Sequence, residues 1–199
     1  MAYYRSSRIL PTILTIIIII VAIAGLVALA RVVFTGSSNR SQDVVDVSKQ
    51  NLLNAEDGRA VRMTVRGPIV ADEDFRSFSI TVSPSSRQYT AYTGYLDAVT
   101  AQETLSNNRA AYEQFVHALD KANLVLGNPF EGEKNNVLGI CATGKVYEFS
   151  LLNGGEVEEM LWTSTCGGSK GSLRASAAQL SQLFLEQIPN GVDVTLNGK

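Results

Sequence analysis

The side chains that could perform chemistry in this 199-residue chain are few: two cysteines, Cys141 and Cys166, and one histidine, His117. A cysteine activated by a nearby histidine can act as a nucleophile, whereas two cysteines that lie close together can form a disulfide. Closed zinc sites built from cysteine and histidine are excluded, because they need four such ligands. The cysteines therefore have either a catalytic or a structural interpretation.

The catalytic interpretation depends on the segment 160–166, MLWTSTC, which ends at Cys166 and is followed by Arg174. This segment resembles the strand end of sortases, the anchored transpeptidases in which a hydrophobic-Thr-Cys motif works with a histidine and an arginine. The resemblance implies that Cys166 is the thiolate, His117 its acid/base partner and Arg174 the oxyanion stabiliser. The sequence departs from that family, because His117 falls within a helical pattern and we expect about five strands.

The structural interpretation depends on a tight turn at Asn153-Gly154-Gly155. If Asn153 and Gly154 are its central residues, Cys141 lies directly opposite Cys166 in the hairpin. If Gly154 and Gly155 are central, the cysteines are one diagonal step apart. Either register predicts a disulfide at the margin of the core, on the strand face that also carries Phe149 and Trp162. Such a bond persists in an oxidising compartment, which places this part of the chain outside the cytoplasm.

The 22 residues from Ile9 to Ala30 carry no charged side chain. As a helix they would be ~33 Å long, against a hydrocarbon core of ~30 Å. We therefore predict a transmembrane signal-anchor helix at 9–34, which contacts the lipid bilayer, with residues 1–8 in the cytoplasm. Ala28-Leu29-Ala30 also imitates a signal-peptidase site, so cleavage near Ala30 and release of a soluble domain is the alternative.

After position 34 the chain has 14 basic and 19 acidic residues, a net charge of −5. This balance disfavours nucleic acid as a partner, because phosphate neutralisation needs a basic surface. Residues 35–59 are polar and short of aromatics, which predicts a flexible stalk. We expect an extracytoplasmic domain at 60–190 and a tail at 191–199.

The pattern of the predicted domain alternates strands and helices. Two hairpins and a preceding strand are indicated by period-two alternation, and two helices by apolar stripes capped at Asn108 and Ser176. The fold class is therefore α+β, an antiparallel sheet packed by two helices. Superposing the halves at an offset of 69 aligns Phe78 with Tyr147 and Phe115 with Phe184, which suggests a hairpin-helix duplication.

Other motifs favour plain structural roles. The acidic groups near 72–74, 131–133 and 156–159 lack the spacing of a calcium loop. The segment 167–172, GGSKGS, lacks the residue order of a phosphate-binding loop. We therefore expect no metal and no cofactor.

The layout is similar to that of small single-anchor extracytoplasmic bacterial proteins. The leading prediction is a non-catalytic, membrane-anchored domain that binds an envelope or cell-surface protein or has a structural role in the envelope. The sortase-like cysteine transpeptidase and the secreted binding domain are the two alternatives.

Overall fold

The computed structural model describes residues 18, 21 and 47–188 of the chain. Apart from Ile18 and Val21, the predicted membrane segment lies outside the described residues, as do residues 35–46 and the predicted tail. No helix within the described part is long and apolar enough to cross a membrane. The fold below is that of residues 47–188.

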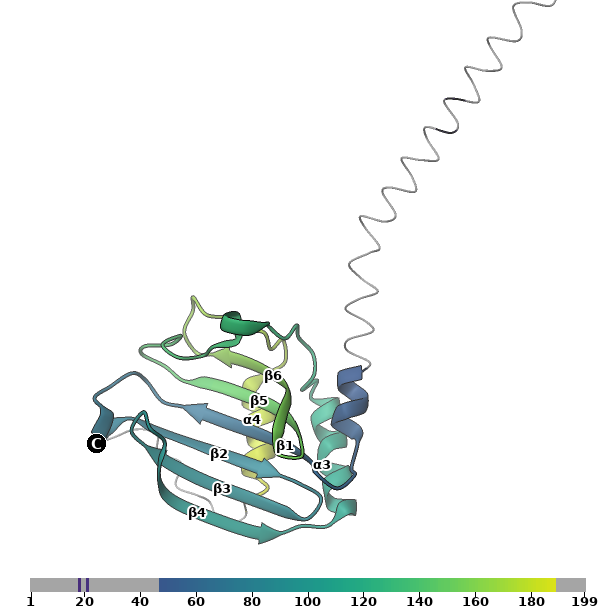
Figure 1. Ribbon diagram of the computed structural model, residues 1–199, viewed down its shortest axis with the longest axis horizontal. Helices are drawn as coiled ribbons and strands as arrows, with labels where there is room; N and C mark the ends of the chain where they lie inside the picture. Colours follow the sequence, from purple (N-terminus) through teal and green to yellow (C-terminus); the bar gives the residue numbers. More distant parts are fainter. Residues whose placement is uncertain (1–17, 19–20, 22–46, 189–199) are drawn as a thin grey trace, which may run out of the picture. The chain divides into compact units, whose positions relative to one another are not determined.

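The described chain is an α+β fold with a six-stranded antiparallel sheet and three helices, which confirms the predicted fold class at this level (Figure 1). One helix includes residues 47–53. The remaining elements, in chain order, are β1 (Arg59–Arg66), the 3₁₀ turn η1 (Asp72–Asp74), β2 (Arg76–Val82), β3 (Ser86–Thr93), β4 (Ala98–Ser106), α3 (Arg109–Lys121), the 3₁₀ turn η2 (Gly132–Asn135), β5 (Val146–Asn153), β6 (Glu156–Ser164) and α4 (Ala177–Leu185).

The first strand lies in the middle of the sheet, whose order is β4-β3-β2-β1-β5-β6. β1 pairs with β2 through Met63 opposite Ile80, and with β5 through Met63 opposite Phe149. Side chains on these strands alternate between the two faces, so every second residue points to the same side. Val61, Met63 and Val65 lie on one face of β1 and are each at most 2% exposed. They form the floor of the core.

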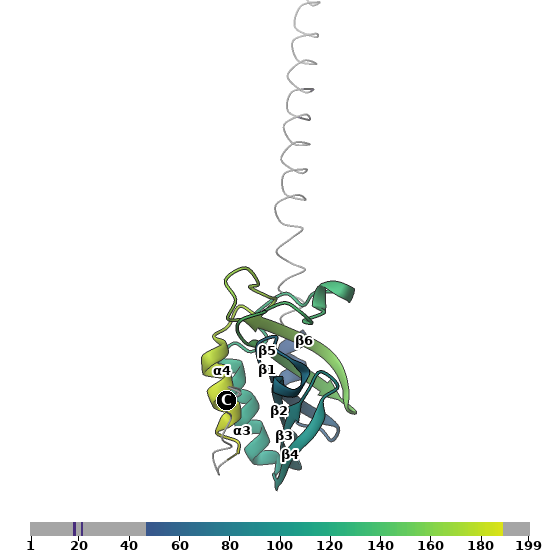
Figure 2. The same ribbon diagram turned by 90° about the vertical axis from the view of Figure 1, so that its left-hand side faces the viewer.

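Both long helices cover the same face of the sheet, as the side view in Figure 2 shows. The side chain of Asn108 accepts a hydrogen bond from the Ala111 backbone N–H (3.0 Å) and caps α3, and Ser176 caps α4 in the same way. The predicted apolar stripe of α3 is confirmed, since Tyr112, Phe115, Val116, Leu119 and Ala122 are all buried.

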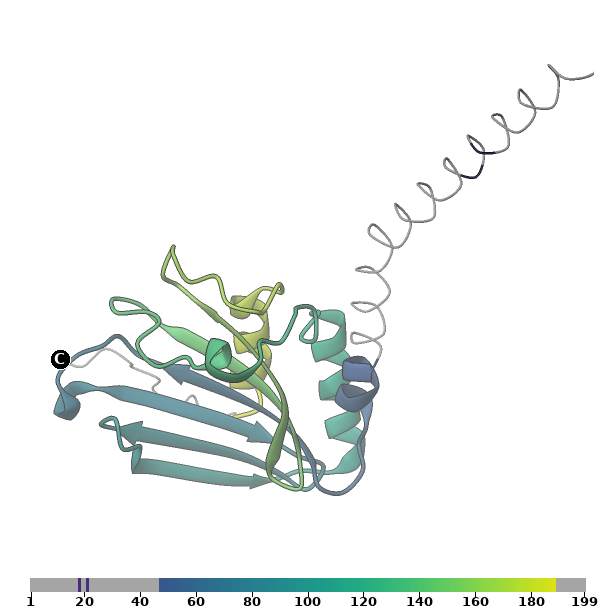
Figure 3. The same ribbon diagram turned by 45° about the horizontal axis from the view of Figure 1, so that its top comes forward.

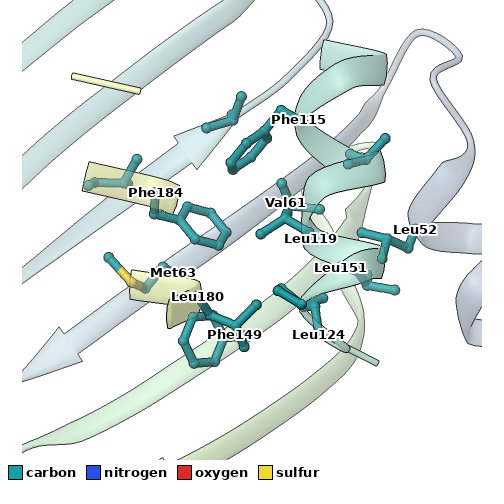
Figure 4. Close-up of a cluster of buried hydrophobic side chains, with 14 of the residues drawn as sticks. Leu52, Val61, Met63, Phe115, Leu119, Leu124, Phe149, Leu151, Leu180 and Phe184 are labelled. Carbon is teal, nitrogen blue, oxygen red and sulfur yellow. The ribbon is translucent and has the colours of Figure 1, made fainter. Parts of the chain in front are cut away.

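The centre of the core is aromatic. The ring of Phe184 on α4 meets that of Phe115 on α3 edge to face at 5.2 Å, and it lies 6.0 Å from the ring of Phe149 on β5 (Figure 4). Leu180 and Met63 pack beside them and are 0% exposed. Each helix is thereby held to the other and to the sheet by burial of large side chains.

The helix at 47–53 belongs to the folded domain, although the sequence predicted a stalk as far as residue 59. Leu52 is 1% exposed within the main core, and Lys49 forms an ion pair with Asp120 of α3 (2.9 Å). Figures 1 and 3 show this helix beside α3. Although the sequence of this segment is mostly polar, Leu52 on one face of the helix is buried. Its burial is enough to hold a short helix against the domain.

The sequence analysis missed β4 and therefore undercounted the strands. Every residue of β4 is exposed or half-buried, because this strand forms one edge of the sheet. An edge strand without a buried face has no clear apolar alternation. The second half contains no strand equivalent to β4 between β6 and α4. The two halves therefore differ in strand number, and the suggested duplication stays a prediction.

A half-buried carboxylate joins the helix at 47–53 to the sheet, and it yields a prediction about pH. The Ser48 hydroxyl donates to Glu159 on β6. Burial raises the pKa of the Glu159 carboxyl above its usual 4.5, opposed by the Ser48 hydrogen bond. Folding therefore favours the protonated form, and this group's contribution to stability declines as pH rises from about 4.5 through the raised pKa.

We expect Glu159→Gln to raise the free energy of unfolding at pH 7 and to flatten its decline above pH 4.5. Denaturant unfolding at a series of pH values measures this. Glu158→Gln is the matched control, because the Asn153 amide and then Arg59 lower the pKa of the exposed Glu158 carboxyl. Its pH dependence should change in the opposite direction. An unaltered profile for Glu159→Gln contradicts the account.

Candidate functional site

The two cysteines form the disulfide that the hairpin predicted. Cys141 and Cys166 are bonded with their Cα atoms 5.5 Å apart. The bond lies beyond the β5–β6 ladder, whose last pair is Val146 with Ser164. Cys141 is 3% exposed and packs with Val146 and Trp162 in a second, smaller core. The disulfide therefore fastens the long segment before β5 to the segment after β6.

The register of this hairpin follows the second of the two predicted turns and then shifts. Gly154 and Gly155 are the central residues, with φ of 61° and 91°, values that favour glycine. A bulge between Leu151 and Leu152 then changes the pairing, so that Phe149 faces Leu161. The prediction that Phe149 and Trp162 share a face was wrong. Leu161 joins the main core, and Trp162 packs with the disulfide on the other side.

The chain around the disulfide permits little change. The Lys145 backbone N–H donates to Thr165 Oγ1 (2.8 Å), and the Thr165 N–H donates to the Lys145 carbonyl (3.0 Å). A Cβ atom at Gly144 would collide with Thr165 Oγ1 and approach the Cys141 sulfur. Glycine at this position therefore lets the two segments approach closely enough for the sulfurs to bond.

The structure does not bring together the residues that the sortase resemblance singled out. The Cys166 sulfur is bonded to Cys141 and has no thiol in this state. His117 is exposed on α3, off its buried stripe, and Arg174 is exposed before α4. Within the described residues no hydrogen bond joins the three side chains. A thiolate mechanism would require reduction of the disulfide first.

A group of exposed apolar residues lies at the loop end of the sheet near the disulfide. We call this set the apolar end surface: Ile69, Val70, Tyr95, Leu96 and Leu138, which are between 41% and 95% exposed. These residues come from three separate connections: β1 to β2, β3 to β4, and α3 to β5. Ile69, Tyr95 and Leu138 line a pocket of about 380 Å³ whose wall includes Cys141.

Hydrogen bonds hold these loops in place. The Tyr95 hydroxyl donates to the Val70 carbonyl (2.7 Å) and accepts from the Val70 N–H (3.1 Å). The Tyr95 ring stacks on Phe75 at 4.3 Å. The Ile69 N–H donates to the carbonyl of Ala142, next to the disulfided Cys141. The apolar side chains are thus presented on a connected framework, part of which depends on the disulfide.

An acidic turn borders the apolar end surface. Asp72, in η1, accepts a hydrogen bond from the Tyr95 N–H (2.7 Å) through its carboxylate. Glu73 and Asp74, the other residues of η1, are exposed. Among the described residues no group of three or more histidine, cysteine or acidic side chains has a geometry that could hold a metal ion.

The sheet face opposite the helices is polar and contains a groove of about 300 Å³. Arg66 crosses one end of it, where its guanidinium meets Glu148 at 2.6 Å and Asp97 at 3.8 Å. Arg62 also lines the groove, four residues earlier on β1. Hydroxyl side chains from β2 and β5 also line the groove, among them Ser77, which pairs in register with Arg66, and Ser150, which pairs with Arg62.

No known protein-family model matches this sequence, and comparison with curated proteins finds no similar sequence. Conclusions about function therefore depend on the site itself.

The sequence analysis did not find either surface. All five members of the apolar end surface lie in loops, where apolar residues have no period to reveal them. The groove combines residues from several strands whose pairing order is non-local. The apolar pairs Ile69-Val70 and Tyr95-Leu96, each followed within two residues by an aspartate, are the sequence signal that pointed toward the first surface.

Proposed function

We propose that this chain is a single-pass membrane protein whose folded domain lies outside the cytoplasm and binds an envelope or cell-surface protein through the apolar end surface, without catalysis. The observation that carries the proposal is the presence of five exposed large apolar side chains on three loops, of which Ile69, Tyr95 and Leu138 line one pocket. Contiguous exposed apolar surface of this kind marks interaction sites, because isolated monomers rarely expose it.

The location is supported by two independent features. The charge-free segment from Ile9 to Ala30 has the length of a membrane span. The Cys141–Cys166 bond is of a type that persists in oxidising compartments and is rare in the cytosol. A membrane anchor followed in the chain by a domain with a disulfide favours an extracytoplasmic location for that domain.

Charge favours a protein over the bilayer as the occupant of the apolar end surface. Its neighbour η1 carries three carboxylates, Asp72, Glu73 and Asp74. Membrane-binding surfaces generally combine apolar side chains with lysine and arginine, which anionic lipids attract. An acidic border instead suits a partner that inserts an apolar side chain flanked by basic residues.

Site-specific photocrosslinking in intact cells tests this proposal. A photoreactive amino acid replaces Leu96 or Leu138 in the full chain, and Gln114, exposed on α3, is the control position. We expect one discrete protein adduct from both surface positions and none from Gln114. Glu73→Gln combined with Asp74→Asn should reduce the adduct several-fold, because it removes two of the three carboxylates of the acidic border.

Three outcomes contradict the proposal. Equal adducts from Gln114 would show non-specific contact. Adducts with lipid alone would assign the surface to the bilayer. An adduct of two copies of this chain would make the surface a self-association site.

A further inference from the structure

Strand β4 forms one edge of the sheet, and no described element lies beyond it (Figures 1 and 3). An edge strand presents backbone N–H and C=O groups that can pair with a further strand. Natural edge strands are commonly blunted by lysine, proline or a bulge, and β4 contains neither lysine nor proline. The register shift beside Thr100 leaves the stretch 101–106 regular. This stretch is therefore open to pairing.

The hydrogen bonds between β3 and β4 show which backbone groups of β4 point outward. The Asn107 N–H donates to the Ser85 carbonyl (2.9 Å). Bonded pairs alternate along an antiparallel ladder, so the register places Glu103 and Leu105 in bonded pairs with β3. The backbone groups of the intervening residues point away from β3, and these residues are Gln102, Thr104 and Ser106. Of these groups, only the Ser106 carbonyl has a partner among the described residues, the Arg87 guanidinium.

The charges along this edge are complementary to those of a second copy. Glu103 and Leu105 are half-buried on the helix-covered side of β4, and Leu105 packs against the main core. Arg87 lies opposite Leu105 on β3. Its guanidinium donates to the carbonyls of Ser106 and Gln187 and meets no carboxylate among the described residues.

Antiparallel pairing of two β4 strands about Thr104 brings these charges together. It places Glu103 of each copy opposite Leu105 of the other, in the same row as Arg87 of that other copy. Two strand spacings amount to ~10 Å, a gap that an arginine and a glutamate side chain can bridge together. The two Glu103 side chains do not face each other, so the pairing sets no like charges opposite.

We propose that two copies of this chain associate by antiparallel pairing of their β4 edges. The pairing satisfies the outward N–H and C=O groups of Gln102 and Thr104. It also sets the two Thr104 side chains opposite each other, a favourable cross-strand pair. The result is one continuous sheet with the helices of both copies on the same side. The apolar end surface shares no residue with β4, so this proposal is independent of the one above.

Amide hydrogen exchange of the full chain in detergent micelles tests this pairing, with light scattering to count the copies in each micelle. The Gln102 and Thr104 N–H groups should exchange at least ten-fold more slowly in micelles with two copies than in micelles with one. The Glu103 and Leu105 N–H groups, which face β3, are internal controls and should not respond. Fast exchange of Gln102 and Thr104 in two-copy micelles would overturn the proposal. Slow exchange in one-copy micelles would assign the edge to another segment of the same chain and also overturn it.

Thr104→Pro removes an outward N–H that β3 does not use, so it should keep the fold and abolish the slow exchange of Gln102. Thr104→Ala keeps that N–H and is the matched control. Glu103→Lys should weaken the association at least ten-fold, because it places a second positive charge beside Arg87 of the other copy. Unchanged thermal midpoints verify that the variants fold. Slow Gln102 exchange that persists in Glu103→Lys or in folded Thr104→Pro overturns the proposal. These outcomes leave the crosslinking test of the apolar end surface unaffected.

Discussion

Replacing Phe184 with alanine is expected to lower the free energy of unfolding by about 3–5 kcal/mol. The Phe184 side chain is 0% exposed and contacts rings from α3 and β5. Its removal loses apolar burial and leaves a cavity between helix and sheet that rigid strands cannot fill. Chemical denaturation measures the loss, with the fluorescence of the single tryptophan, Trp162, as the probe.

Leu185→Ala is the matched control for that variant. Leu185 follows Phe184 on α4 but is 37% exposed, so its truncation should cost below about 1 kcal/mol. A cost for Phe184→Ala no larger than that for Leu185→Ala would contradict the assigned packing of α4 against the sheet.

The second large effect is expected from loss of the disulfide. Cys141 and Cys166 are 25 residues apart in sequence, and a cross-link of this span restricts the unfolded chain by about 3.5 kcal/mol in the chain-entropy treatment. We therefore expect Cys141→Ser combined with Cys166→Ser to lower the free energy of unfolding by roughly 3–4 kcal/mol. The loops that carry Ile69 and Leu138 should also become more mobile, because the Ile69 N–H bonds to the residue after Cys141.

Reduction of the unaltered chain provides the comparison for this variant. Reductant should lower the free energy of unfolding of the unaltered chain by a similar amount, and it should leave that of the double variant unchanged. Equal stability of the oxidised and reduced chains would show that the bond does not contribute to this fold. Hydrogen exchange at residues 67–70 and 137–142 reports the loop mobility separately.

The local elements could be predicted from the sequence where one face is buried. The stripe on α3 and the alternation on β1 are regular because each element packs one face on the core, and Asn108 and Ser176 are standard capping residues. The contact of Cys141 with Cys166 could also be predicted, because a tight turn at Gly154-Gly155 fixes which residues approach.

Features that depend on tertiary context could not be predicted. The bulge at Leu151/Leu152 reverses the faces of β6, and no single residue type marks it. The position of β1 between β2 and β5 brings Arg62 beside Ser150, residues that are distant in the sequence. The groove arises from this pairing order and is therefore visible only in the folded chain.

The proposed extracytoplasmic location depends on the oxidation state of Cys141 and Cys166 in cells. The most direct measurement traps thiols in cells that express the full chain, by acid quenching and immediate alkylation, and then determines the intact mass. The account predicts that no cysteine is alkylated before reduction and that both are alkylated after it. Two alkylated cysteines without reduction would contradict the disulfide in cells and remove its support for a domain beyond the membrane.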